Sequence, residues 1–510
     1  MTSDQILGRL RDLSSASPDR TAFVSAEGSL SFGRLHRTAL ELAAWLAKEG
    51  GVRPGDRVAI ALPRSLEGVQ AIYGVLAAGA VYVPIPVQGP AARVEAILAS
   101  IAPRLLMTTA DTARRLVAPG NGEVPVASIA IASEGQGLAP FLADAAGRLV
   151  TERRPEDVSA IFFTSGSTGQ PKGVMMTYGG LGGMAGWIAQ WARLSGDDRL
   201  MSDAGLHYAT AFDLLTPVFS CCCTILLSDR ETMFPERVAA TMASQHATLW
   251  CSSATALRLL YERGQLERRD LRALRRVEFF GEPLSVAVLR CLMAILPKAE
   301  FVNFYGATEA HRIATYTVPR PMPEDFATLP IGRPTDNYLF SLRDPAGQTV
   351  QPGDIGEICV EGAKCLTGYW ADAVMSAAKR VGGRPNSYRS GDLARFGKDG
   401  TLHLVGREDR MVKLRGHRFD LGEVEAVLKA DPGVGEALAF AFANSRGDLE
   451  IRVAVGGLAA NGLEARLDRL AAEKLPAYAR PVRIAILTRL PQLSNGKIDR
   501  EKIRTLLAEM

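Results

Sequence analysis

The sequence has few cysteines, and none of them shows the spacing of a metal site. The seven cysteines of the 510-residue chain lie at positions 221, 222, 223, 251, 291, 359 and 365, with no Cys-x-x-Cys pair. Their odd number and scatter argue against a disulfide framework or a zinc site, so we expect reduced cysteines in a cytoplasmic protein. We interpret the three consecutive cysteines as small apolar residues of a buried strand, not as a reactive cluster.

The sequence also lacks a long unbroken apolar run and an excess of one charge, and we expect no secretory leader. The longest apolar stretch, 71–87, is interrupted by two glycines and two prolines and predicts a buried helix and strand. The N-terminus carries charges in every turn, unlike a signal peptide. Because the net charge is only +4, we expect no nucleic-acid partner and no membrane association. The 47% of apolar residues is enough for a large core.

Short apolar runs alternate with helical patterns along the first part of the chain. The runs at 56–62 and 81–85 are typical of buried strands. One helical face before them carries Leu35, Ala39, Leu42 and Leu46. The alternation resumes between about residues 158 and 316. Strands that alternate with helices predict crossover connections, a largely parallel sheet and an α/β fold.

The chain changes character twice after this region. Between 332 and 405, short strand-like runs alternate with Gly, Pro and Asp turns, which predicts a smaller antiparallel, β-rich subdomain. After Gly406 the sequence is strongly charged and then alternates between helix and strand patterns again. We therefore predict an N-terminal core over 1–408 and a small α+β domain over 409–510.

A turn rich in glycine and hydroxyl groups follows the apolar run 161–163. It reads TSGSTGQPKGV over 164–174. Backbone N–H groups and hydroxyls of such a turn can surround phosphate oxygens, and Lys172 adds a positive charge. The turn is not a P-loop, because Pro171 takes the place of the second glycine and Gly173 that of the hydroxyl residue.

A second glycine-rich segment lies close by and is interpreted differently. Residues 180–185 fit G-x-G-x-x-A, and Asp203 follows at about the distance of a dinucleotide-binding acid. Thr177 and Tyr178, directly before it, make a poor buried strand. We therefore expect a glycine-rich helix start there.

Further motifs make the sequence resemble the adenylate-forming superfamily, which includes acyl-CoA synthetases, luciferases and the adenylation domains of nonribosomal peptide synthetases. Pro86 and Ala307 stand where the family usually has Asp and Pro. The resemblance implies a large N-terminal domain of α/β subdomains with a small β-rich subdomain, and a small mobile C-terminal domain. Beside 164–174, the motifs are LAAGAVYVP at 76–84, NFYGATE at 303–309, YRSGDL at 388–393, GRED at 406–409, KLRGHRFDLGEVE at 413–425 and NGKIDR at 495–500.

The resemblance also implies the reaction. A carboxylate attacks the α-phosphate of ATP to give acyl-AMP and pyrophosphate, and the acyl group then moves to a thiol. Lys497 corresponds to the catalytic cation beside the α-phosphate, where a fixed charge stabilises the transition state. Glu309 corresponds to the ligand of Mg²⁺, and Asp409 to the hinge of the C-terminal domain.

The nucleotide site follows from the same motifs. The resemblance assigns the glycine-rich loop to the β- and γ-phosphates, Thr308 to the α-phosphate, and Asp392 with Arg407 to the ribose. Tyr305 is expected to stack on adenine beside 281–283. The full set implied for ATP and AMP is Thr164, Ser165, Gly166, Ser167, Thr168, Gly169, Lys172, Gly281, Glu282, Pro283, Asn303, Tyr305, Gly306, Thr308, Asp392 and Arg407.

The acceptor thiol is indicated by the stretch 413–423. It resembles the K-I-R-G-x-R-I-E-L-G-E form of peptide-synthetase adenylation domains, whereas CoA ligases usually carry K-S-G-G there. We therefore predict a stand-alone enzyme that loads a separate phosphopantetheinylated carrier protein in natural-product (antibiotic) biosynthesis, with CoA as the alternative acceptor. A non-catalytic nucleotide-binding homologue is disfavoured, because Lys497, Glu309 and Lys172 are all present.

The acid substrate is less sharply defined. We expect an amino acid, standard or nonstandard, whose amine is held by Asp213 or Glu278. The literal Phe-Asp pair points to Asp213, whereas the distance to the downstream strand places Tyr208 and Ala209 there. Glu278 and Arg312 either pair with each other or bind a polar substrate. The predicted pocket comprises His207, Tyr208, Ala209, Asp213, Leu249, Glu278, Phe280, Phe304, Arg312 and Ile313.

Overall fold

The computed structural model divides the chain into two compact units. The first unit is formed by Met1–Val87, Ile97–Phe163 and Gly173–Gly406, and the second by Gln88–Ala96, Thr164–Lys172 and Arg407–Met510. The predicted boundary at 408/409, including the Asp409 hinge, lies outside the described residues and stays a prediction. The structure describes residues 5–87, 91–116, 129–132, 153–164, 171–209, 211–324, 326, 328–407, 411–444, 446–457, 462–491 and 498–510.

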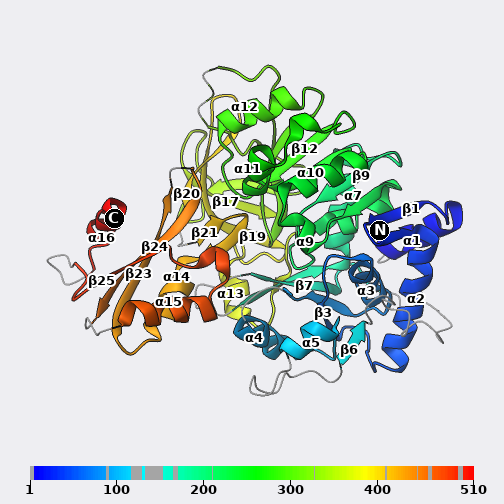
Figure 1. Ribbon diagram of the computed structural model, residues 1–510, viewed down its shortest axis with the longest axis horizontal. Coiled ribbons are helices and arrows are strands. Elements are labelled where there is room, and N and C mark those ends of the chain that lie inside the picture. Colours follow the sequence, from blue (N-terminus) through cyan, green and yellow to red (C-terminus); the bar gives the residue numbers. More distant parts are fainter. Residues whose placement is uncertain are drawn as a thin grey trace. The chain divides into compact units, whose positions relative to one another are not determined.

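A nine-stranded sheet dominates the first unit (Figure 1). Its neighbouring strands β9 to β13 pair in parallel, as expected for crossover connections, whereas β14 is antiparallel to β13. In spatial order the strands are β15 (Arg333–Pro334), β14 (Ala310–Thr317), β13 (Glu300–Ala307), β12 (Arg276–Phe280), β11 (Leu249–Ser253), β9 (Arg199–Ser202), β10 (Cys223–Leu226), β1 (Thr21–Ser25) and β2 (Gly28–Ser31).

The first unit also contains most of a seven-stranded sheet. The predicted strands at 56–62 and 81–85 are confirmed as β3 and β4, whose residues pair in parallel. The order is β18 (Gly368–Tyr369), β8 (Lys172–Thr177), β7 (Val158–Thr164), β4 (Val81–Pro84), β3 (Arg57–Ala61), β5 (Leu105–Thr109) and β6 (Ile129–Ala132). The predicted antiparallel subdomain is also present, as a sheet of β16 (Leu339–Arg343), β17 (Gly356–Glu361), β19 (Ser387–Phe396) and β20 (Leu402–Arg407).

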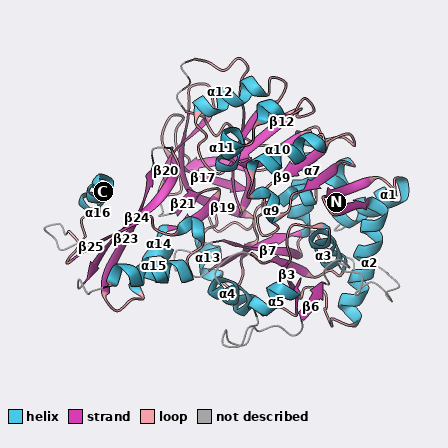
Figure 2. Ribbon diagram, in the orientation of Figure 1, coloured by secondary structure: helices cyan, strands magenta, loops and turns pink. Residues whose placement is uncertain are grey.

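Helices pack along these sheets (Figure 2), and several of them begin at polar caps. The side chain of Ser31 accepts a hydrogen bond from Arg34 N at the start of α2, and Ser65 accepts one from Gly68 N at the start of α3. The predicted apolar face of α2 is buried. The helices of this unit are α1 (Gln5–Ala16), α2 (Phe32–Lys48), α3 (Leu66–Ala77), α5 (Ala110–Leu116), α7 (Tyr178–Trp191), α8 (Pro217–Ser220), α9 (Asp229–Thr232), α10 (Pro235–Ser244), α11 (Ala254–Arg263), α12 (Val286–Ile295) and α13 (Ala373–Ala378); the residues of α4 (Ala91–Ile101) are divided between the two units.

The glycine-rich segment 180–185 lies inside α7, as predicted. The side chain of Thr177 caps the helix by accepting from Gly180 N, so these glycines start a helix. The expectation of a poor strand before it is wrong, because β8 extends through the buried Thr177. The cysteine run is also explained, since Cys222 and Cys223 are buried where β10 begins.

The second unit has its own core. A hairpin of β21 (Met411–Leu414) and β22 (His417–Asp420) precedes a three-stranded sheet of β23 (Val434–Ala443), β24 (Leu449–Gly457) and β25 (Arg483–Leu487). The helices are α14 (Leu421–Lys429), α15 (Leu463–Lys474) and α16 (Arg500–Glu509). Phe419, Val424 and Leu467 pack in its apolar cluster. Among the described residues of both units, no helix has the length and apolar character needed to cross a membrane.

Candidate functional site

Most of the predicted acid pocket lies on neighbouring strands of the nine-stranded sheet. Leu249 on β11 is two residues from Cys251, which pairs with Glu278 on β12. Phe280 pairs with Phe304 on β13, and the two rings stack at 4.7 Å. Because side chains alternate along a strand and paired residues share a face, the side chains of these residues (Leu249, Cys251, Glu278, Phe280 and Phe304) lie on the same face of the sheet. The sheet therefore brings together predicted pocket residues that are far apart in the chain.

Glu278 and Arg312 pair with each other, which is the first of the two alternatives. Arg312 Nη2 lies 2.6 Å from Glu278 Oε2, and Arg276 Nε lies 2.7 Å from Glu278 Oε1. Burial alone raises the pKa of the Glu278 carboxyl, but the Arg312 and Arg276 charges outweigh it, so the pKa lies below its usual value. Both carboxylate oxygens of Glu278 thus accept a hydrogen bond from a buried arginine side chain.

The indole ring of Trp191, the last residue of α7, contacts both guanidinium groups. Trp191 lies under Arg276, with 4.1 Å between the guanidinium carbon and the ring centre, and under Arg312 at 5.4 Å. Arg312 also lies 4.3 Å from the ring centre of Phe304. Contacts with aromatic faces partly replace the water that a buried cation loses. The wall of the pocket is thus a closed network of charged and aromatic side chains.

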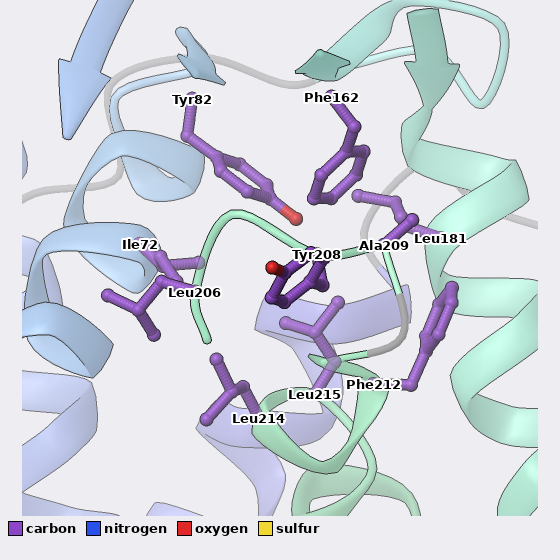
Figure 3. Close-up of a pocket in the computed structure, with 10 residues that line it drawn as sticks. All are labelled: Ile72, Tyr82, Phe162, Leu181, Leu206, Tyr208, Ala209, Phe212, Leu214 and Leu215. Carbon is purple, nitrogen blue, oxygen red and sulfur yellow. The ribbon is translucent and has the colours of Figure 1, made fainter. Parts of the chain in front are cut away.

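The segment that follows β9 lines a cavity to which none of the strand residues named above contributes. It forms a mostly apolar pocket with side chains of α3, β4, β7 and α7, in which the Tyr82 and Tyr208 hydroxyl groups are visible (Figure 3). Tyr208, Ala209 and Phe212 line the pocket, whereas Asp213 is not among the lining residues. The lining residues are Ile72, Tyr82, Phe162, Leu181, Leu206, Tyr208, Ala209, Phe212, Leu214 and Leu215.

Asp213 has a buried cationic partner that the sequence did not predict. Its Oδ2 contacts Arg64 Nη2, and the Arg64 side chain is 1% exposed. The other oxygen, Asp213 Oδ1, is buried and has no hydrogen-bond partner within the described ranges. Burial raises the pKa of the nearby Asp203 carboxyl to about 7, although the Arg64 charge opposes this rise. An acidic group with a bare, buried oxygen therefore lies beside the pocket.

Two predicted nucleotide residues meet at the end of β13. The Tyr305 hydroxyl donates a hydrogen bond to Asp392 Oδ2, and both side chains are buried. Burial and the Asp392 charge raise the pKa of Tyr305 well above its usual value, so the phenol stays protonated. Asn303 donates to the carbonyl oxygen of Pro330 at 3.0 Å, which holds the strand end to the following loop. Asp392 is thus positioned by a neutral donor.

Glu309 is buried at 3% exposure directly after this strand, and its carboxylate can serve as a hard oxygen ligand. The Tyr369 hydroxyl donates to Glu309 Oε1 at 2.8 Å, which orients the carboxylate. No three metal-binding side chains cluster in the part of the chain that the structure describes. One oriented carboxylate fits Mg²⁺, because this ion usually takes its other ligands from phosphate and water.

The remaining predicted residues are placed as follows. Gly281 follows β12 with a positive φ of 95°, and Glu282 accepts a hydrogen bond from Thr255. Lys172 begins β8, and Arg407 ends β20. The residues Ser165, Gly166, Ser167, Thr168, Gly169, Asp409 and Lys497 lie outside the described residues. Thr164 ends β7, His207 contacts the ring of Tyr208, Ile313 is buried on β14, and Pro283 and Thr308 are described in turns.

Several residues of this site were missed by the sequence reasoning. Arg64 and Trp191 lie far from the motifs in the chain, so no spacing signal connects them to the pocket. Tyr369 lies far from Glu309 in the sequence, and only the fold brings its hydroxyl group to the Glu309 carboxylate. His311 lies two residues after the 303–309 motif, and a histidine in an apolar strand was the signal that could have identified it.

The comparisons with known proteins agree with this geometry. The family model described as AMP-binding enzyme matches residues 10–370, and that of its C-terminal domain matches residues 423–497. The L-proline--[L-prolyl-carrier protein] ligase of Streptomyces coelicolor is 32% identical, with 97% of this chain and 95% of that protein covered. The phenyloxazoline synthase MbtB of Mycobacterium tuberculosis is also 32% identical, but this chain spans only 34% of its length.

A solved structure has the same fold along the whole chain. The amide bond synthetase McbA from Marinactinospora thermotolerans superposes with a TM-score of 0.85 over 99% of both chains, at 24% identity. The α/β fold with a large N-terminal and a small C-terminal domain is therefore confirmed. The chain belongs to the AMP-binding enzyme family and is a ligase that forms an acyl-adenylate and then a thioester.

Proposed function

We propose that this enzyme activates an amino acid with ATP and transfers it to the phosphopantetheine thiol of a separate carrier protein in natural-product biosynthesis. The proposal that the acid is activated with ATP rests on one observation. Phe304 belongs to the acid pocket, and the next residue, Tyr305, contacts Asp392 of the predicted nucleotide site. The two sites thus meet at the carboxyl end of β13, where ligands of α/β sheets bind. An acid held there would face the α-phosphate of ATP.

We assign each part of the reaction to a different side chain. Asp392 would accept the ribose hydroxyl groups, and Tyr305 fixes its orientation by donating one hydrogen bond. Glu309 would hold Mg²⁺, which neutralises phosphate charge when bound, and Tyr369 positions that carboxylate. The loop around Lys172 would bind the outer phosphates, and Lys497 would stabilise the charge that develops on the α-phosphate.

Asp213 is the proposed partner of the substrate amine. Each Glu278 oxygen accepts from a buried guanidinium group, whereas Asp213 Oδ1 is buried and has no hydrogen-bond partner among the described residues. A buried acceptor without a partner costs free energy, and a substrate ammonium would remove that cost. The relative that loads proline also supports an amino acid and a carrier protein, since the similarity covers 97% of this chain.

The test is ATP–pyrophosphate exchange with amino, aryl and aliphatic acids, followed by mass spectrometry of a carrier protein and of CoA supplied in competition. We expect exchange with amino acids and a mass shift on the carrier protein. Lys497→Ala should lower exchange by about 10²–10³. Exchange with amine-free acids alone would refute the role of Asp213, and acylation of CoA alone would refute the carrier protein as acceptor.

A further inference from the structure

One buried arginine side chain joins two residues of the segment that follows β9. Arg64 Nη1 donates a hydrogen bond to the carbonyl oxygen of Ala204 at 2.8 Å, and Arg64 Nη2 donates one to Asp213 Oδ2. Only 1% of the Arg64 side chain is exposed. Because the donors of a guanidinium group are fixed in one plane, two acceptors bound to it keep one relative geometry. Arg64 therefore sets the orientation of the Asp213 carboxylate relative to the main chain of the same segment.

Arg64 is itself held in place, because it stands at the start of a buried helix. It directly precedes Ser65, whose side chain caps α3 by accepting a hydrogen bond from Gly68 N. All residues of α3 from Gly68 to Ala77 are buried. The backbone that carries the guanidinium group is therefore fixed by a cap on one side and by core packing along the helix.

The same helix contacts the segment after β9 at two further points. A Cβ at Gly68 would lie 2.7 Å from Leu206 Cδ1, so the first turn of the helix packs directly on that side chain. The Tyr73 hydroxyl donates a hydrogen bond to the carbonyl oxygen of Leu214 at 2.9 Å. In Figure 3, Ile72 of α3 lines the cavity together with Leu206. Helix α3 thus supports this segment on both sides of the residues that line the cavity.

Asp213 is held both at its main chain and at one carboxylate oxygen. The Thr224 hydroxyl donates to the Asp213 carbonyl oxygen at 2.6 Å, which fixes the backbone beside β10. Arg64 donates to Oδ2, whereas Oδ1 has no hydrogen-bond partner among the described residues. Since a carboxylate is planar, a contact that fixes one oxygen also sets the direction of the other. The direction of Oδ1, the oxygen proposed for the substrate amine, thus depends on Arg64.

The charge of Arg64 acts in the same direction as its geometry. A buried carboxylate without a cationic partner is favoured in its neutral form. Burial raises the pKa of the neighbouring Asp203 to about 7, against the opposing charge of Arg64. Arg64 is thus a cation close to two acidic groups, and it favours the charged carboxylate that binds an ammonium group most strongly.

We propose that Arg64 is a positioning residue for substrate binding, which directs the Asp213 carboxylate toward the substrate amine and keeps it charged. The inference rests on the proposed function, in which Asp213 binds that amine. Arg64 acts through Asp213, because both outer nitrogens of its guanidinium group already donate to protein oxygens. Its removal should therefore weaken binding of the amino acid and leave binding of ATP unchanged.

The experiment measures kcat, KM for ATP and KM for the best amino acid of the pyrophosphate-exchange screen. Arg64→Met should raise the amino-acid KM by about 10- to 10²-fold, the range for a hydrogen bond to a charged group, and should leave the KM for ATP within about twofold of wild type. A substitution that only destabilised the fold would lower kcat through loss of active enzyme and leave both KM values unchanged. That outcome, or an unchanged amino-acid KM, would overturn the positioning role.

A matched control removes a different contact between α3 and the same segment. Tyr73→Phe deletes the hydrogen bond to Leu214 without touching Asp213, so the amino-acid KM should stay within about twofold of wild type. An increase as large as that of Arg64→Met would show that any loosening of the segment has this effect, which would refute a specific role of Arg64.

A double substitution tests whether Arg64 acts through Asp213. Asp213→Asn should raise the amino-acid KM, and the addition of Arg64→Met should raise it no further, because the two residues act as one unit. Effects that multiply would overturn the inference. If Arg64→Met does not fold, as circular dichroism would show, Arg64→Lys decides: it keeps the charge but not the planar fork, so its amino-acid KM should lie above that of wild type, and an unchanged KM would refute the role.

Failure of this inference and failure of the proposed function give different results. Exchange with amino acids together with an unaffected Arg64→Met would refute the role of Arg64 and leave the proposed function intact. Exchange with amine-free acids alone would refute the amine site at Asp213, and the inference with it.

Discussion

The substitution Glu278→Gln tests whether the pocket wall depends on its buried charges. Glu278 is 2% exposed in its side chain, and its two oxygens accept from Arg276 and Arg312, whose side chains are 8% and 5% exposed. Removing one partner of a buried ion pair typically costs about 3–5 kcal/mol, because the remaining charge is left uncompensated. Glutamine keeps one acceptor oxygen, so we expect a loss near the lower end, about 3 kcal/mol.

Thermal unfolding followed by circular dichroism measures this loss. For a unit of this size, about 3 kcal/mol corresponds to a decrease of roughly 4–6 °C in the melting temperature. Arg312→Met should decrease it less, because Glu278 keeps Arg276 as a partner. Asp270→Asn, which removes an exposed ion pair with Arg272, is the control and should leave the melting temperature unchanged.

The dependence on pH adds a second check. The pKa of Glu278 lies below its usual value in the folded protein, so its carboxylate stabilises the fold above the pKa of the unfolded chain. This stabilisation is lost as the pH falls through the lower, folded-state pKa. The difference between wild type and Glu278→Gln should therefore be full at pH 7 and shrink under acidic conditions. A melting temperature within 1 °C of wild type at pH 7 would refute the network as a source of stability.

Three further predictions concern other parts of the molecule. Tyr369→Phe removes the donor to Glu309, so the Mg²⁺ concentration for half-maximal exchange should rise about tenfold, and an unchanged value would contradict the positioning role. Gly306→Ala should lower both exchange and melting temperature, since its Cβ would meet the Arg312 backbone at 2.6 Å; wild-type values would show that this approach is not required. Iodoacetamide should label the exposed Cys291 first, while Cys222, whose pKa burial raises to about 12, should stay protected until unfolding, as peptide mapping can verify.

Local patterns were sufficient to predict much of the fold. The apolar face of α2, the strands β3 and β4, and the antiparallel sheet from β16 to β20 depend on residue periodicity and turn residues that are close in sequence. The pocket wall was predicted from motif positions, and the strands do bring Glu278, Phe280 and Phe304 to one face. Such features need no knowledge of which distant segments meet.

The partners of buried charges could not be predicted in the same way. Arg64 and Asp213 are 149 positions apart, and Glu278 meets Arg312 across 34 positions. An arginine in a sequence gives no sign of which carboxylate it will find, because the pairing is decided by the sheet order. The left-handed backbone at Arg312 was equally hidden, since arginine has no preference for that conformation.

Three features that cost stability occur together between β12 and β14, although each of them also occurs elsewhere in the described chain. Charged side chains on otherwise apolar strands, a positive φ at a residue other than glycine, and unsatisfied buried nitrogens each cost stability. All three occur between β12 and β14, beside the apolar cluster of Trp250, Phe279 and Phe301. The apolar core on the same strands offsets these costs. We therefore expect substitutions at this strand end to change the rate of exchange more than conservative substitutions in that core.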